Sequence, residues 1–354
     1  MKPLVSILIP AHNVQEHISE ALTSATEQTW GRKEVIVVDD GSTDRTAEVA
    51  HRFASQNVQI VSVMSQGAAA ARNHALRICQ GDYIQWLDAD DVLAPDKIER
   101  QLQAASETED RRVLLSSPWA PFYYRTRHAE FVENALCQDL SPVEWLIRKM
   151  GENVYMQTGT WLTSRELAEA AGPWDTRLLS DDDGEYFCRV LLASSGTRFV
   201  SGTGVFYRIA GSNSLSRIGT SERKREALLI SMRLHIQYLR SLEESDRIRE
   251  TCVTYMQNWY HTFYPDRPDL AIELQQLAAE LHGTLKPPQL RRKYAWMEPL
   301  LGRRTSHRVQ ETLPRLKLEM FRRWDKVLSR FEYPRIRASP KRVSGRLTQQ
   351  NKVE

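Results

Sequence analysis

The stretch Trp86-Leu87-Asp88-Ala89-Asp90-Asp91 decides the fold, because it sets three carboxylates directly after an apolar run, Tyr83-Ile84-Gln85-Trp86-Leu87. β-Branched and aromatic residues dominate that run and Gly81-Asp82 marks a turn before it, so a buried strand is predicted at 83–87. Pro95 suits the first turn of a helix that begins near Asp96. The acids therefore lie at the carboxyl end of a strand, where open α/β sheets bind their ligands.

Closely spaced like charges indicate either a solvated turn or a cation site. Carboxylates this close repel one another unless water or a cation separates them. Hard oxygen ligands on a short loop suit Mg²⁺ or Mn²⁺, which usually arrive with substrate phosphates. From this segment alone, a solvated acidic turn that begins a helix stays an equal alternative.

Upstream of this stretch, apolar runs rich in β-branched residues alternate with segments of helical periodicity. Strands are predicted at 5–9, 34–38 and 58–63, with helices between them and a further helix from Gly67 to Cys79. This order predicts an α/β fold with a mostly parallel central sheet and helices on both faces.

A second acidic loop, residues 39–44, ends the strand at 34–38 and should open on the same sheet edge. An ionised carboxylate only accepts hydrogen bonds. Asp39 or Asp40 could accept the imide N–H of a uracil ring, and Asp88 the hydroxyls of a ribose. His12, at the end of the first strand, could stack on a flat base. The alternative is a plain turn with a helix cap, which two such loops in one sheet make less attractive.

Four motifs in order resemble the family 2 glycosyltransferases with the GT-A fold: residues 5–13, 38–44, 67–73 and 87–91. The last of these resembles the DxD motif of that family. The resemblance runs from Val5 to about Gly211. It implies a GT-A type nucleotide-sugar-binding fold and a metal-dependent sugar transfer, with inversion, from a UDP-sugar to a hydroxyl of a glycan or lipid-linked glycan.

The resemblance also implies a role for each matching residue. Asp40 would contact the base, with Asp39 supporting its loop, and Asp88 would face ribose or metal-bound water. His12 stands where the family commonly has Tyr, which reduces the stacking area. The implied donor-binding set is Pro10, Ala11, His12, Asp39, Asp40, Arg72, Asp88 and Arg208, and the implied ligands of Mn²⁺ or Mg²⁺ are Asp90 and Asp88.

A third acidic stretch, residues 175–185, precedes a helix predicted at 186–193. Its five acids exceed what capping a helix requires. The stretch resembles the family's Phe-Asp…Glu-Asp pattern, with Trp174-Asp175 and Asp182-Asp183 in those places. The resemblance implies that Asp183, in preference to Asp182, is the general base for the acceptor hydroxyl. Crowding by Asp181, Asp182 and Glu185 is expected to raise the pKa of Asp183.

Residues 207–216 resemble the closing Tyr-Arg segment of the family, which makes Arg208 and Ser214 candidates for diphosphate contact. Ala210 lies near the place where many members carry a metal- or diphosphate-binding His. A third protein ligand is therefore in question, although diphosphate oxygens and water could complete an octahedral shell. The aromatic residues at 118–124 could line a sugar groove, but core packing is the more frequent role of such residues.

Length and composition bound the remaining expectations. The chain has 354 residues and a net charge of +3. No apolar run approaches the roughly 20 residues of a membrane span, and the start lacks a signal-peptide layout. Four scattered cysteines suit a reducing cytoplasm. Expected divisions are a GT-A domain at 1–218 (nucleotide half 1–110, acceptor half 111–218), a helical region at 219–285 and a basic helical tail at 286–354, disordered from Lys341.

The tail carries 19 Lys and Arg against 6 Asp and Glu from Lys286 onward. Its apolar residues recur on one helical stripe that includes Leu316, Met320 and Trp324, with basic residues interleaved. Such a helix suits an anionic membrane surface and a peripheral place at the inner face of the membrane. The alternative is a helix packed on the body or in a dimer, with a solvated basic face. Nucleic acid is not expected, because no recognisable binding module accompanies the charge.

Two other functions stay open on the sequence. A nucleotidyltransferase would need a glycine-rich, basic first loop for a triphosphate, which the residues around His12 do not provide. A nucleotide-sugar-binding protein without catalysis would keep the donor motifs, and turnover of a donor separates it from an enzyme.

Overall fold

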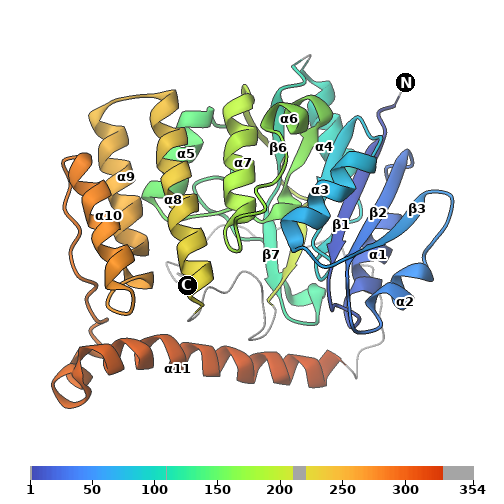
Figure 1. Cartoon of the computed structure of the whole chain (residues 1–354). Helices are drawn as coiled ribbons and strands as arrows, with labels where there is room; N and C mark the ends of the chain where they lie inside the picture. Colours follow the sequence, from blue (N-terminus) through green and yellow to red (C-terminus); the bar gives the residue numbers. More distant parts are fainter. Residues whose placement is uncertain (1, 109, 210–220, 330–354) are drawn as a thin grey trace.

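The structure, a computed structural model, describes residues 2–108, 110–209 and 221–329, which contain a seven-stranded sheet of order β3-β2-β1-β4-β8-β6-β9 (Figure 1). β1 to β4 run parallel where they pair, and so do β6 and β9, whereas β8 is antiparallel to β4 and β6. The predicted mostly parallel sheet is confirmed. The strands are β1 (Val5–Ala11), β2 (Lys33–Asp40), β3 (Val58–Val63), β4 (Tyr83–Trp86), β6 (Val113–Ser116), β8 (Leu162–Ser164) and β9 (Gly196–Phe199).

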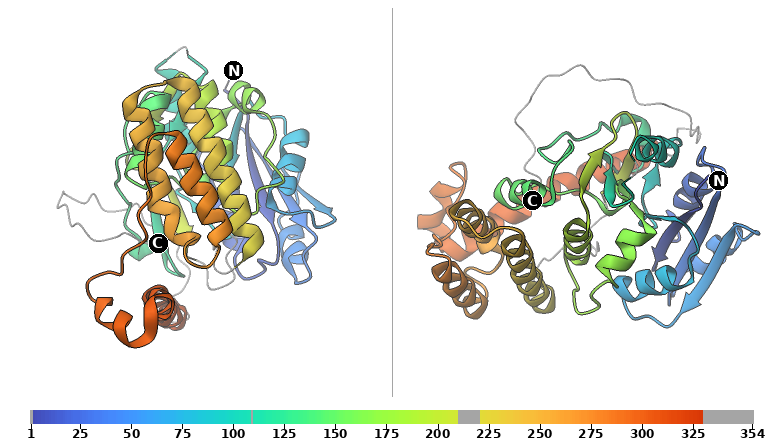
Figure 2. Two further views of the ribbon diagram at one scale, coloured as in Figure 1. Left: turned by 60° about the vertical axis from the view of Figure 1, so that its left-hand side comes forward. Right: turned by 90° about the horizontal axis from the view of Figure 1, so that it is seen from above.

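Helices cover both faces of the sheet. Right-handed crossovers from β1 to β2 to β3 put α1 and α2 on one face, and the return from β3 to β4 puts α3 on the other (Figures 1 and 2). The central strands β1 and β2 read as nearly continuous runs of Val, Ile and Leu because neither of their faces meets water. The first seven helices are α1 (Ile18–Thr26), α2 (Thr46–His51), α3 (Ala68–Ile78), α4 (Lys97–Ser106), α5 (Pro142–Gly151), α6 (Arg165–Ala171) and α7 (Asp182–Ala193).

The parallel register brings the ends of β1, β2 and β4 to one edge. Ala11 pairs with Asp39 and Leu8 with Trp86, so the acidic loops at 39–44 and 88–91 leave the sheet side by side. The loop after β2 turns at Gly41, whose φ is +67° and whose added Cβ would lie 2.9 Å from the amide nitrogen of Ser65. This edge is the one predicted to bind ligands.

A second sheet in the described residues has the order β5-β10-β7, built from β5 (Val92–Leu93), β10 (Val205–Arg208) and β7 (Trp119–Phe122). Trp119 and Phe122 are buried, so these two aromatic residues of 118–124 serve packing. One sequence boundary is corrected, because the helix predicted at 186–193 begins at Asp182. A 3₁₀ turn, η2 (Thr158–Thr160), precedes β8.

Three further helices stack beside α5 and α7 (Figures 1 and 2): α8 (Glu222–Leu242), α9 (Asp246–Trp259) and α10 (Pro268–Glu280). Their buried residues, such as Met232, Met256 and Leu274, belong to the same contiguous hydrophobic cluster as Ile7 of β1. The division predicted at 218/219 stays a prediction, but these helices share their core with the sheet. Short 3₁₀ turns are η1 (Thr126–His128), η3 (Tyr260–Thr262) and η4 (Ala295–Met297).

The long helix α11 (Glu298–Ser329) crosses below the rest of the molecule in Figure 1, at the end where β1 finishes. Its backbone leaves helical geometry at Gly302, and Pro314 lies inside it, so the helix begins well before the stripe that the sequence indicated. The tail from Lys341 lies outside the described residues. In the described part of the chain, no helix is both long and apolar enough for a bilayer crossing. All four cysteines lie in that part and are free thiols.

Candidate functional site

The loop after β1 is tied to the loop after β2 through Asn13. The Oδ1 atom of Asn13 accepts the N–H of Thr43 at 2.8 Å, and the N–H of Asn13 donates to the hydroxyl of Ser42 at 2.9 Å. His12 is exposed beside it, with Nδ1 2.8 Å from the carbonyl oxygen of Asp40. An exposed ring held by its edge suits stacking on a flat base, which stays a prediction for His12. Pro10 and Ala11 end the strand that carries this loop.

Asp39 and Asp40 are both buried at the end of β2 but differ in their partners. Asp40 accepts the N–H of Gln66 on Oδ1 at 2.8 Å and the N–H of Gly67 on Oδ2 at 2.9 Å, so it fixes the turn that begins α3. Within the described residues, Oδ1 of Asp39 has no hydrogen-bond partner. A buried acceptor is costly without a donor, such as the N–H of a base would supply. The geometry therefore favours an exchange of the two roles inferred from the resemblance.

The acids after β4 lie in different environments. Asp91 is buried, its Oδ1 accepts the backbone N–H of Arg208 at 2.7 Å, and burial raises its pKa well above the ordinary value. Burial and then the charge of Asp88 raise the pKa of Asp90 to about 6, against the opposing charge of Arg208. The side chain of Asp88 is 29% exposed. Asp88 and Asp90 therefore form a close pair of like charges with one side open to solvent.

This pair fits the metal expected from the sequence. Within residues 2–108, 110–209 and 221–329, no group of three or more His, Cys, Asp and Glu side chains has the geometry to hold a metal ion. One or two carboxylates are nevertheless the usual protein share of a Mg²⁺ site whose other ligands are phosphate oxygens and water. Burial, with the charge of Asp88 adding to it, raises the pKa of Asp90, and a bound cation would offset that cost. Ala210 and Ser214, on which the third ligand and a diphosphate contact depended, lie outside the described residues.

Arg72 of α3 connects the loop after β4 with the start of α7. Its Nη2 donates to Oδ1 of Asp88 at 2.9 Å and its Nη1 to Oδ2 of Asp182 at 2.6 Å. The guanidinium lies 4.4 Å from the ring centre of Trp174, and only 8% of the side chain is exposed. The charges of Asp182 and Asp88 raise the pKa of Arg72 despite its burial. Two acidic motifs that are far apart in the sequence are thus bridged by the guanidinium of Arg72.

Both catalytic candidates lie in the first turn of α7. Burial raises the pKa of Asp182 to about 6; Arg72 opposes this shift, and the charges of Asp183 and Asp88 add to it. Asp183 accepts the hydroxyl of Thr158 on Oδ2 at 3.1 Å and the N–H of Gly184 on Oδ1 at 2.9 Å. Asp182 is therefore paired with a buried arginine, whereas Asp183, within the described part of the chain, accepts hydrogen bonds only from a hydroxyl and a backbone N–H. This difference agrees with the preference for Asp183 as the base.

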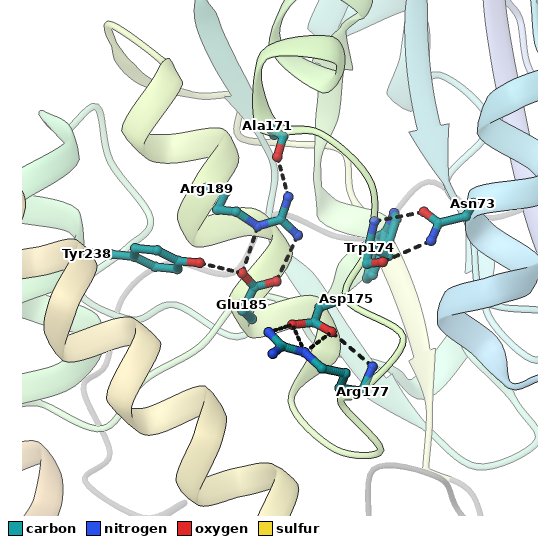
Figure 3. A network of polar contacts seen from close by, with 8 residues as sticks. All are labelled: Asn73, Ala171, Trp174, Asp175, Arg177, Glu185, Arg189 and Tyr238. Atoms are coloured by element: carbon teal, nitrogen blue, oxygen red, sulfur yellow. Dashed lines mark hydrogen bonds and ion pairs between the residues drawn. The ribbon is translucent and has the colours of Figure 1, made fainter.

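Asp181 and Glu185 turn away from Asp183, so of the three acids expected to crowd it only Asp182 stays close enough to interact. Asp181 accepts the hydroxyl of Ser231 of α8 at 2.5 Å. Glu185 forms a two-point ion pair with Arg189, at 2.7 and 2.8 Å, and accepts the hydroxyl of Tyr238 at 2.7 Å (Figure 3). These two acids anchor α7 to α8 and hold the first turn of α7 in place.

The backbone of Trp174 is held by the side chain of Asn73, as Figure 3 shows. Asn73 of α3 donates from Nδ2 to the Trp174 carbonyl at 2.9 Å and accepts the Trp174 N–H at 2.7 Å. The indole stacks on Tyr186 with ring centres 4.1 Å apart. Asp175, which the family pattern singled out, pairs instead with Arg177 at 2.6 Å. The indole is therefore a fixed platform under the guanidinium of Arg72.

Arg208 ends β10 in a buried position behind the acids. Its Nε donates to the carbonyl of Asp90 at 2.7 Å, its Nη1 to the carbonyl of Tyr123 at 2.8 Å, and its Nη2 to the carboxylate of Glu20. The guanidinium thus holds the backbone of the 88–91 loop in this structure. The diphosphate contact expected for Arg208 stays a prediction.

The site also contains residues that the sequence did not assign. Thr158 contacts Asp183 from the 3₁₀ turn η2, and no sequence signal marks it. Asn73 was part of the motif at 67–73 without a role, and Asn13 ended the first motif in the same way. Both are amides that join loops across the site, a role that short polar side chains near turns often have.

The comparisons with known proteins agree with this geometry. The family model described as Glycosyl transferase family 2 matches residues 6–133. An uncharacterized glycosyltransferase of Haemophilus influenzae is 39% identical over 103 residues, which are 28% of this chain and 41% of that protein. The chain thus spans about two fifths of the length of the first curated relatives it matches.

Two solved structures share the fold. TarS of S. aureus in complex with UDP-GlcNAc superposes with a TM-score of 0.63 at 18% identity, covering 79% of this chain and 81% of that one. The mannosyltransferase PcManGT of Pyrobaculum calidifontis, in complex with GDP-Man and Mn²⁺, has a TM-score of 0.51 at 19% identity, covering 92% and 88%. At these identities the likeness establishes the fold alone. The GT-A type architecture predicted from the sequence is confirmed.

Proposed function

The N-terminal part of the chain, residues 6–133, belongs to glycosyl transferase family 2, and on that basis we propose that the protein transfers a sugar from a nucleotide-sugar donor to a hydroxyl acceptor. We propose a UDP-sugar as donor and a glycan or lipid-linked glycan as acceptor. The UDP-GlcNAc bound to TarS and the GDP-Man bound to PcManGT support the donor class.

One observation carries the proposal: Arg72 contacts both Asp88 and Asp182. The donor-side loop after β4 and the acceptor-side start of α7 are therefore within one side chain of each other. A sugar donor and an acceptor hydroxyl must meet within about 3–3.5 Å to react. A site where the two acidic motifs lay on opposite sides of the sheet would not allow this.

The nucleoside would lie over the ends of β1 and β2. His12 is exposed for stacking, and the unpaired Oδ1 of Asp39 is an acceptor for the imide N–H of uracil. Asp40 keeps the neighbouring turn in shape through the N–H groups of Gln66 and Gly67. This arrangement favours a uracil base, because cytosine has no N–H at the equivalent ring position.

Asp183 would act as the base for the acceptor. Its carboxylate takes the proton of the acceptor hydroxyl while that oxygen attacks the anomeric carbon from the face opposite the diphosphate. A carbon–oxygen bond to the acceptor forms, the bond to the diphosphate breaks, and the nucleoside diphosphate leaves with the electron pair. The anomeric configuration is inverted. Arg72, fixed between Asp88 and Asp182, is positioned to bind developing negative charge on the donor.

Asp90 and Asp88 would hold Mn²⁺ or Mg²⁺ together with diphosphate oxygens, and the cation supplies charge neutralisation for the departing diphosphate. The Mn²⁺ present with GDP-Man in PcManGT supports this assignment. We propose that removal of divalent cations with a chelator lowers donor affinity as well as turnover, since the two acids then repel the diphosphate.

The test is donor turnover by the full chain and by Asp183→Asn. With Mn²⁺, a panel of nucleotide sugars is screened by thermal shift, where a true donor at one hundred times Kd stabilises the protein by about 2.7 kcal/mol. Released nucleoside diphosphate is then measured with and without oligosaccharide acceptors. Asp183→Asn should keep the thermal shift and lose turnover by about 10²-fold or more.

Glu166→Gln is the matched control, because Glu166 is an exposed acid in α6 outside the site. It should keep both the thermal shift and the turnover. If the wild-type protein binds a donor yet releases no diphosphate with any acceptor or with water, it is a nucleotide-sugar-binding protein and not a transferase.

A further inference from the structure

α11 contacts the rest of the molecule through charged and polar side chains. The carboxylate of Asp325 accepts the backbone N–H of Tyr124 at 2.9 Å and the Nε–H of Arg125 at 2.6 Å. Lys326 pairs with Glu16 at 3.0 Å. One turn earlier, Arg322 reaches the phenol oxygen of the same tyrosine at 3.2 Å. The inward face of α11 is therefore polar over its last turns.

The outward face of α11 is apolar. Its large side chains recur at steps of three and four residues and so form one stripe along the helix. Each of them is between 48% and 68% exposed: Leu313, Leu316, Met320, Phe321, Trp324 and Val327. We call these six residues the apolar stripe.

This orientation is the reverse of what a helix packed on a protein body should show. Such a helix turns its apolar side to the core and its polar side to water. Single exposed apolar residues are ordinary, but a contiguous row of six marks an interaction surface. The described part of α11 therefore contacts the body through its polar side and leaves its apolar side exposed. Something must cover the apolar stripe when the protein works.

The basic residues around the apolar stripe favour an anionic membrane surface as its partner. Lys317 and Arg323 lie on the exposed surface of α11 between residues of the apolar stripe. The chain from Lys286 onward carries 19 basic against 6 acidic residues. Apolar residues that insert between basic side chains match a bilayer with anionic headgroups, and exposed tryptophan suits the headgroup boundary. Pairing with a second copy would instead bring two strongly basic segments together, which repel.

We propose that α11 is a membrane-docking helix that lies in the plane of an anionic bilayer with the apolar stripe inserted. The helix would then attach the protein peripherally, without spanning the bilayer.

The docked helix would also set the orientation of the donor site. Glu16, the partner of Lys326, lies a few residues after His12, and Tyr124 follows β7, which pairs with the strand that ends in Arg208. The last turns of the helix thus lie at the end of the sheet where β1 finishes (Figure 1). An acceptor anchored in the same bilayer would approach that edge, which favours a lipid-linked glycan as acceptor. This second step rests on the proposed function, whereas docking does not.

Docking is tested by sedimentation of the full chain with two kinds of vesicle, phosphatidylcholine alone and phosphatidylcholine mixed with phosphatidylglycerol. The wild-type protein should bind the mixed vesicles at least ten-fold more strongly, and less so as salt is raised. The triple variant Leu316→Ser, Met320→Ser, Trp324→Ser should lose at least ten-fold in binding. Because these side chains are exposed, circular dichroism and the thermal shift with donor should match wild type.

Met64→Ser with Ile272→Ser is the matched control, since both residues are exposed apolar side chains outside α11. It should bind mixed vesicles as wild type does. The proposal is overturned if the triple variant binds the mixed vesicles as strongly as wild type does. It is also overturned if wild type binds both kinds of vesicle equally. The proposal is also overturned if the wild-type protein binds no vesicles and instead forms a concentration-dependent dimer in light scattering that the triple variant abolishes. If the wild-type protein binds the mixed vesicles but turns over no donor, the proposed function is contradicted and docking is not.

Discussion

Arg72 and Asp182 form a largely buried ion pair, with Nη1 of Arg72 2.6 Å from Oδ2 of Asp182. The same guanidinium also contacts Asp88, so the positive charge of Arg72 is shared by two carboxylates from motifs on different elements. Removal of the arginine would leave both carboxylates facing each other in a poorly hydrated place. We therefore expect this ion pair to contribute to the stability of the protein.

Arg72→Ala should lower the free energy of unfolding by about 3 kcal/mol, because breaking a buried pair leaves uncompensated charge. Asp182→Asn in the Arg72→Ala background should restore part of this loss. A double-mutant cycle by urea denaturation should give a coupling energy of about 1–3 kcal/mol.

Arg177→Ala serves as the control for this cycle. Arg177 pairs with Asp175 at a similar distance but is 71% exposed, so its loss should change stability by less than about 1 kcal/mol. Additive effects of the Arg72 and Asp182 changes would mean that their ion pair contributes nothing to stability.

Asp39→Asn and Asp40→Asn should separate binding from loop structure. Asp40→Asn replaces an acceptor of two backbone N–H groups by a side chain that can accept on one atom only, and should destabilise the protein by about 1–3 kcal/mol. Asp39→Asn should leave stability nearly unchanged and weaken UDP binding about ten-fold or more. Calorimetric titration with UDP and urea denaturation together check both. The roles inferred from the resemblance would be restored if Asp39→Asn destabilised the protein with UDP affinity kept, and Asp40→Asn stayed stable but lost UDP affinity.

Much of the fold follows from local pattern. The strand at Val58–Val63 is predicted to the residue, because a run of β-branched residues between turn signals has few other solutions. The gathering of the acids at 39–44 and 88–91 follows from parallel topology, since such strands finish at one edge. These inferences need only periodicity and connection rules.

The details that differ depend on contacts between distant segments. Which of Asp39 and Asp40 meets backbone N–H groups is decided by the turn at Gln66 and Gly67, and no local pattern encodes it. The helical stripe around Trp324 is visible in the sequence, but its outward direction depends on the pairing of Asp325 with Arg125. Periodicity shows that a helix has two faces and does not show what each face meets.

The stability of the protein should depend on pH through His17. Burial, with the charge of Arg208 adding to it, lowers the pKa of His17 to about 4; Glu16 opposes the shift, and Lys326 and Arg322 support it. In the unfolded chain the pKa is about 6.5. Between these values the unfolded state holds a proton that the native state lacks, so stability rises with pH across about 4–6.5 and is lost as pH falls through it.

His17→Gln should flatten this dependence, by less than about 1.4 kcal/mol per pH unit because the ring is partly exposed. Urea denaturation of both proteins at several pH values from 4 to 7 measures the difference. Asp90 and Asp182 titrate in the same window with the opposite sign, because their pKa values are raised. They contribute equally to both proteins, so the difference isolates His17. Identical slopes for the two proteins would exclude the assigned shift.

Thr158 should matter for catalysis because its hydroxyl donates to Oδ2 of Asp183 at 3.1 Å. Thr158→Val keeps the shape of a buried side chain and removes this donor. Without it the carboxylate can rotate away from the acceptor, so kcat should fall about ten-fold. The KM for the donor should stay the same, because the hydrogen bond that is lost is to Asp183 and not to the donor-side acids. Thr158→Ser retains the hydroxyl and should recover most of the rate. A rise in donor KM with unchanged kcat, or failure of serine to recover more rate than valine, would show that Thr158 acts on packing and not on the orientation of Asp183.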